Sequence, residues 1–141
     1  MWPVPNLKAF LLGSWKLERN LVDHDRATTG RLVGAASFSP CGRGLLYEER
    51  GTLTFGAHRG RAEQTYIYEF IDGDARASVC FRDGRAFHHL DLSRGRDHVC
   101  HACGVDLYEG AFTALNASAW QSEWKVTGPR KNYELATTYT R

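Results

Sequence analysis

Hydrophobic and polar residues alternate over short runs of this chain, and clusters of turn-forming residues separate one run from the next. The runs are rich in Val, Leu, Tyr, Phe, Trp and Thr, and the clusters contain Gly, Asp, Pro or Asn. This rhythm is typical of an all-β protein with many short strands. We expect strands near residues 14–23, 30–39, 44–55, 61–71, 75–81, 86–92, 97–101, 105–115, 118–127 and 131–140.

The first element departs from this rhythm, because residues 5–12 have the pattern of a short helix. Asn6 is a suitable N-cap for it, and Gly13 is a natural stop. Short turns make each later strand pair with the next, and no helix is long enough to cover an open sheet. We therefore predict one domain over residues 1–141, a closed antiparallel up-and-down barrel of about ten strands with a short N-terminal helix.

The start of the first predicted strand carries a known signature. Gly13-Ser14-Trp15, preceded by the short helix, resembles the Gly-x-Trp motif of lipocalins. In that family the tryptophan faces the closed end of the barrel, and an arginine from late in the chain packs across it. The resemblance implies a lipocalin-like (calycin) barrel in which Arg141 packs across Trp15.

The chain also resembles an uncharacterised family of calycin-like domains. The residues that carry this resemblance are Leu46-Tyr47-Glu48-Glu49-Arg50-Gly51, His98-x-Cys100, Asp106-x-Tyr108-x-Gly110 and Gly128-Pro129-x-Lys131. The family has no assigned activity, so the resemblance supports the barrel and leaves the function open.

Composition limits the partners that we expect. The net charge is only +2 and the basic residues are scattered, which argues against a nucleic-acid partner. No apolar stretch is long enough for a membrane helix, and no basic segment followed by a long apolar run begins the chain. We therefore expect a cytoplasmic protein, monomeric or homodimeric, with its four cysteines reduced.

Side-chain alternation identifies candidate interior residues. If Trp15 points inward, Arg19 does too, because side chains alternate along a strand. An internal arginine stays charged and needs a partner, either a ligand carboxylate or an internal acid such as Glu49, which alternates with Tyr47. Two alternatives stay open: Arg19 extends to the barrel rim, or Glu49 lies on an exposed face.

Aromatic residues repeat on single faces of later strands. Tyr68 in the fourth strand, Trp124 in the ninth and Tyr133 in the last are candidate pocket residues. Most such aromatic residues belong to the core. Their hydroxyl and indole groups still make the interior partly polar, as in most ligand pockets.

The segment around residue 100 holds the densest polar chemistry. If Ala102 to Gly104 form a three-residue loop, Cys100 pairs with Asp106 and His98 pairs with Tyr108. The four side chains then form one cluster that could act as acid or base, or ligate haem iron through the histidine. The alternative is a solvated outer face, because a one-residue slip exchanges the two faces.

Two further motifs contain histidine or cysteine. His88 and His89 are adjacent, so at most one is internal, and the leucines that alternate with His88 favour His88. Cys100-x-x-Cys103 invites a zinc assignment, but no second pair of ligands follows it, so we expect no metal site.

Our leading hypothesis is a cytosolic protein that binds a small, mostly apolar molecule, either aromatic or carboxylate-bearing, without a cofactor. A second hypothesis is a cofactor-free proton-transfer enzyme of the lyase or isomerase type, using His98, Tyr108, Asp106 and Glu49. A third is a haem-binding barrel with one axial histidine.

Overall fold

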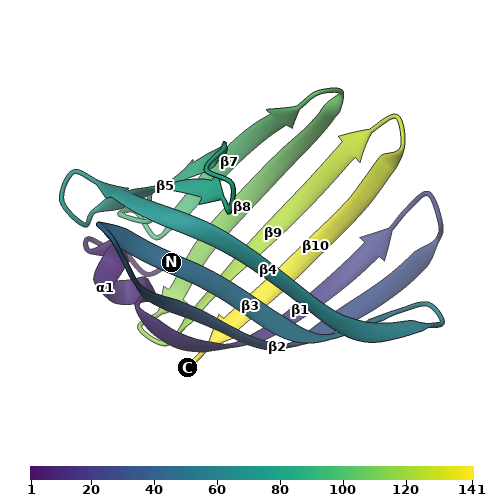
Figure 1. The fold of residues 1–141 in the computed structure, drawn as a ribbon, viewed down its shortest axis with the longest axis horizontal. Coiled ribbons are helices and arrows are strands. Elements are labelled where there is room, and N and C mark those ends of the chain that lie inside the picture. The colour runs from purple at the N-terminus through teal and green to yellow at the C-terminus, as the bar shows by residue number, and fades with distance from the viewer.

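The computed structural model describes all 141 residues, and ten strands form one antiparallel sheet that curls into a nearly closed barrel (Figure 1). The elements are α1 (Leu7–Leu11), β1 (Gly13–Asp23), β2 (Thr28–Cys41), β3 (Gly44–Phe55), β4 (His58–Ile71), β5 (Arg76–Phe81), β6 (Ala86–Leu90), β7 (Arg96–Cys103), β8 (Asp106–Asn116), β9 (Ala119–Gly128) and β10 (Lys131–Thr140). Every predicted strand is present with small shifts at its ends. The prediction of an all-β up-and-down barrel is confirmed.

The short helix α1 closes one end of the barrel (Figure 1). The side chain of Asn6 accepts a hydrogen bond from the backbone N–H of Ala9, which confirms the predicted N-cap. Three side chains of the helix itself are buried, those of Leu7, Phe10 and Leu11. No helix of the fold has the length and apolar character needed to cross a membrane.

A seam between β6 and β7 interrupts the barrel wall. The sheet order runs from β6 through β1 and β10 to β7, and no ladder joins these two edge strands. Isolated hydrogen bonds hold the seam in place of a ladder. The N–H of Val4 donates to the carbonyl of Leu92, and the N–H of Asp91 donates to the carboxylate of Asp97, both at 2.9 Å. The barrel is thus closed by side chains and by the N-terminal segment.

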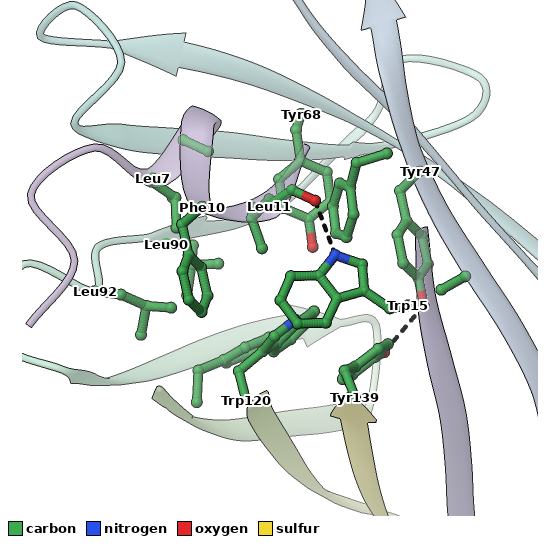
Figure 2. Packing of buried hydrophobic residues seen from close by; sticks show 14 of the residues in the cluster. Leu7, Phe10, Leu11, Trp15, Tyr47, Tyr68, Leu90, Leu92, Trp120 and Tyr139 are labelled. Atoms are coloured by element: carbon green, nitrogen blue, oxygen red, sulfur yellow. Dashed lines mark hydrogen bonds between the residues drawn. The ribbon is translucent and has the colours of Figure 1, made fainter. Parts of the chain in front are cut away.

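The core is concentrated at the closed end, around Trp15 (Figure 2). The indole N–H of Trp15 donates to the carbonyl of Leu11 at 2.8 Å, which ties β1 to α1. Trp120 lies edge-on to Trp15, with ring centroids 6.2 Å apart. Aromatic side chains fill the closed end, so the free volume inside the barrel lies in its middle and toward the open end.

Candidate functional site

A buried ion pair stands at the centre of the barrel. Arg19 of β1 binds Glu49 of β3 through two bonds, of 2.8 and 3.1 Å, and its Nε donates to the hydroxyl of Thr137 on β10 at 2.7 Å. The Glu49 side chain is only 4% exposed. Of the alternatives left open by the sequence, pairing of Arg19 with an internal acid is the one observed.

Two tyrosines extend this network toward the closed end. The hydroxyl of Tyr47 donates to Oε1 of Glu49 at 2.9 Å and lies 3.0 Å from the hydroxyl of Tyr139 (Figure 2). Burial raises the pKa of the Tyr47 and Tyr139 phenols above the ordinary value of 10.0. Both hydroxyls are therefore neutral near pH 7 and act as hydrogen-bond donors and acceptors.

A cavity of about 290 Å³ adjoins the ion pair, and we call it the central cavity. Its walls are mainly aromatic, and its polar groups come from the ion pair and a few neighbouring side chains. The residues that line it are Arg19, Leu32, Tyr47, Glu49, Ala62, Glu63, Gln64, Tyr66, Tyr68, Phe87, His88, Phe112, Trp120, Ser122, Trp124, Leu135 and Tyr139. Apolar walls with a few polar groups are typical of small-molecule sites.

Trp120, one of the lining residues, has a polar atom without a partner. Nε1 of Trp120 is buried without any hydrogen bond, and no other buried side-chain nitrogen or oxygen is left so. The Trp120 ring is stacked on Tyr139, with centroids 3.8 Å apart. A buried donor without an acceptor is costly and uncommon, and because this N–H has almost no accessible surface it is packed into the core and is not open to the cavity.

His88 is the internal member of the histidine pair. It lines the central cavity, whereas His89 is exposed. Burial lowers the pKa of His88 to about 4, so its ring is neutral at pH 7. Simple alternation would place Phe87 on the opposite face from His88, yet Phe87 is buried as well, because the register of β5 and β6 shifts between Val79 and Cys80. This irregularity turns two consecutive side chains inward.

The predicted register of the β7–β8 hairpin is wrong. The turn consists of two residues, and Cys103 pairs with Asp106, so His101 faces Tyr108. Gly104 has a φ of 61°, and glycine at the first central position favours a two-residue turn. His98 and Cys100 therefore point outward, away from Tyr108, and the predicted four-residue cluster does not form.

Both outward residues border the seam. His98 and Cys100 line a groove of about 400 Å³ between β6 and β7, outside the central cavity. The groove shares Phe87 and His88 with the cavity lining. No group of three or more His, Cys, Asp or Glu side chains is placed to hold a metal ion, at the seam or elsewhere.

Asp106 and Tyr108 belong to a separate cluster toward the open end. Nζ of Lys131 donates to the Tyr108 hydroxyl and to the Asp106 carboxylate, both at 3.1 Å. Asp106 reaches across Gly128 of β9, where a side chain would overlap its carboxylate. Burial and the neighbouring Tyr108 raise the pKa of Tyr133 to about 12. None of these residues lines the central cavity.

The structure thus divides the candidate residues among three places. The central cavity takes six of the ten candidate ligand-binding residues: Arg19, Tyr47, Glu49, Tyr68, His88 and Trp124. The open-end cluster takes Tyr108 and Tyr133, and the outer seam takes His98 and Cys100. The four candidate catalytic residues are spread over all three places and do not form one constellation.

Five further lining residues share a strand face with the candidate residues, as alternation along the sequence indicates: Tyr66, Trp120, Ser122, Leu135 and Tyr139. Phe112 shares the face of Tyr108 on β8 and follows from the same rule. Phe87 has no such signal, because its orientation depends on the irregularity in β6.

Comparison with known proteins gives a family and a fold. The model of a family of unknown function, DUF6314, matches residues 11–141. No curated protein matches the chain. Among solved structures, the fold is similar to the S-type phycobiliprotein lyase CPES from Guillardia theta, with a TM-score of 0.65 and 7% identity, over 94% of this chain and 89% of that one.

A second similar structure is a protein of unknown function from the DUF3598 family of Nostoc punctiforme. The TM-score is 0.63 and the identity 12%, over 98% of this chain and 49% of that one. This chain therefore spans about half the length of the Nostoc protein. At such low identities both likenesses show the fold alone.

Proposed function

The chain belongs to the DUF6314 family of unknown function, and we propose that its barrel binds a small, mostly apolar, aromatic molecule in the central cavity. The observation that carries this proposal is the cavity itself, about 290 Å³ of free volume beside a buried ion pair and between aromatic walls. This volume lies near the lower end of the range of small-molecule sites, which indicates a ligand of one or two fused rings.

The arrangement of the aromatic residues supports a planar ligand. Phe87 is stacked on Trp124, with centroids 5.1 Å apart and planes inclined by 16°, and Trp120 is nearly parallel to Phe112. Parallel ring pairs on the cavity wall leave flat faces and edges for offset or edge-to-face packing with a ligand ring.

The first test is native mass spectrometry of the purified protein, together with an absorbance spectrum from about 250 to 700 nm. We expect a bound small aromatic molecule, or an apo protein whose melting temperature rises with members of an aromatic fragment library. A band near 400 nm would instead indicate haem, with His88 as the histidine available from the cavity lining.

A blocking variant locates the binding. Ala62 lines the central cavity, so Ala62→Trp fills part of it, whereas Ala35→Trp places the same side chain on an exposed position of β2. We expect Ala62→Trp to abolish ligand binding and Ala35→Trp to retain it, with both variants folded by circular dichroism. Equal binding by the two variants would place the ligand elsewhere and overturn the proposal.

A further inference from the structure

The ion pair determines which charge the central cavity accepts. We infer that the cavity selects an uncharged ligand and excludes carboxylates, and that Glu49 sets this preference by occupying Arg19. The inference rests on the proposed function and specifies the class of its ligand. It also replaces the sequence-based hypothesis that Arg19 holds a ligand carboxylate.

The geometry of Arg19 leaves few N–H donors free for an anionic ligand. Glu49 takes a bond from each terminal nitrogen of Arg19, and Thr137 takes the bond from Nε. Tyr47 adds a further donor to Glu49, so the carboxylate is bound firmly in place. A ligand carboxylate would have to displace Glu49 or lie beside it, and two carboxylates sharing one cation repel each other.

No other residue of the cavity lining supplies a positive charge for a ligand carboxylate. Besides Arg19 and Glu49, the only other lining residue that is charged at pH 7 is Glu63, so the cavity has one cation and two carboxylates. His88 is neutral there, because burial lowers its pKa to about 4. A carboxylate entering from water would lose its hydration without gaining a free cation, so its binding is disfavoured.

An uncharged polar group, by contrast, meets suitable partners. The hydroxyl-bearing residues Ser122 of β9 and Tyr66 of β4 both belong to the lining. A carbonyl, ether or ring nitrogen accepts from such donors at little desolvation cost. The cavity is therefore complementary to an aromatic amide, ketone, lactone or heterocycle.

The test compares two probes of nearly the same shape, naphthalene-2-carboxamide and 2-naphthoate, by calorimetric titration at pH 7.5. For the wild-type protein we expect the amide to bind at least about ten-fold more tightly, which corresponds to about 1.4 kcal/mol. Comparable or tighter binding of the naphthoate would overturn the inference while leaving the proposed function intact. Failure of both probes and of the whole fragment library would overturn the proposed function itself.

Three variants test the role of Glu49. Glu49→Gln frees the charge of Arg19, so we expect the preference to invert toward the naphthoate. The matched control is Glu48→Gln, the same change at the preceding residue of β3, which lies outside the cavity lining. It should bind the two probes as the wild type does.

The double variant Arg19→Gln/Glu49→Gln removes both charges and should restore the preference for the amide. If Glu49→Gln is too unstable to titrate, its melting temperature with each probe gives the same comparison, because a ligand stabilises the state that it binds. Inversion by Glu48→Gln, or no inversion by Glu49→Gln, would show that Glu49 does not set the preference.

Discussion

The guanidinium of Arg141 lies over the indole of Trp15, with Cζ 4.0 Å from the ring centroid. The last residue of the chain thus covers the tryptophan that begins β1, as the resemblance to lipocalins implies. Arg141 also donates to the backbone carbonyls of Leu12 and Ala117. Because Trp15 in turn binds the carbonyl of Leu11, the closed end is tied together through these two residues.

Replacing Arg141 by alanine should loosen the closed end. It removes one cation–π contact and two hydrogen bonds to backbone carbonyls, so we expect a loss of about 1–2 kcal/mol in the free energy of unfolding. Urea denaturation followed by tryptophan fluorescence measures it. The control is Arg130→Ala, at an exposed turn position, which should change little. Equal losses in the two variants would mean that the contact with Trp15 contributes nothing.

The hydroxyl of Tyr47 should matter for stability beyond its ring. Tyr47→Phe keeps the ring but leaves Oε1 of buried Glu49 without one of its donors, so we expect a loss of about 1–3 kcal/mol in the free energy of unfolding. Tyr68→Phe is the matched control, because Tyr68 lines the same cavity from β4 and takes no part in this network. A Tyr47→Phe variant as stable as Tyr68→Phe would contradict the prediction.

The ion pair shows what alternation along strands can predict. Trp15 fixes which residues of β1 point inward, Tyr47 does the same in β3, and both phases place Arg19 and Glu49 inside the barrel. The pairing of Arg19 with Glu49 was one of the alternatives that the sequence left open, and it is the one observed. Regular strands with buried aromatic anchors carry enough information for such inferences, because the side-chain period is fixed at two.

Alternation fails where the count of residues changes locally. Predicting the register of the β7–β8 hairpin requires knowing the length of its turn. Placing Gly104 at the end of a three-residue loop assigned His98 to the wrong face. Predicting the orientation of Phe87 requires knowing that the pairing of β6 is irregular, and the residue pattern does not show this irregularity. Turn length and bulges depend on how two strands meet, and a one-residue change exchanges the faces.

A close approach of β2 and β3 explains a pair of facing glycines. Gly34 pairs with Gly51, and a Cβ on Gly34 would overlap the carbonyl oxygen of Arg50 and lie 2.5 Å from Cα of Gly51. We expect Gly34→Ala to cost about 1–3 kcal/mol in the free energy of unfolding, because the strands must move apart. Thermal and urea denaturation measure this loss.

The control for Gly34→Ala is Gly104→Asn. Gly104 has a positive φ, but no atom lies within 4 Å of a Cβ placed there, and asparagine tolerates this backbone region better than most residues. The turn variant should therefore lose much less stability than Gly34→Ala. The reverse order would show that turn geometry, rather than strand approach, limits substitution of these glycines.

Stability should depend on pH through His88. Burial lowers its pKa from 6.5 to about 4, and this effect outweighs the hydrogen bond to the His89 carbonyl, which raises the pKa, while the nearby His101 and His89 lower it slightly more. Between these pH values the unfolded chain binds the proton more tightly than the folded one. The contribution of the neutral ring is therefore complete above pH 6.5 and is lost as the pH falls toward 4, on the order of 3 kcal/mol in all.

Replacing His88 by glutamine removes this titration, whereas His89→Gln changes an exposed histidine and should retain it. Urea denaturation of both variants and the wild type between about pH 4 and 7.5 measures the difference. We expect the stability of the wild type and of His89→Gln to fall more steeply with decreasing pH than that of His88→Gln. If the three stabilities instead fall in parallel, His88 titrates at its ordinary pKa and is not sealed inside the barrel. Protons, and small ligands with them, would then reach the central cavity through the seam between β6 and β7, where His88 lines both spaces.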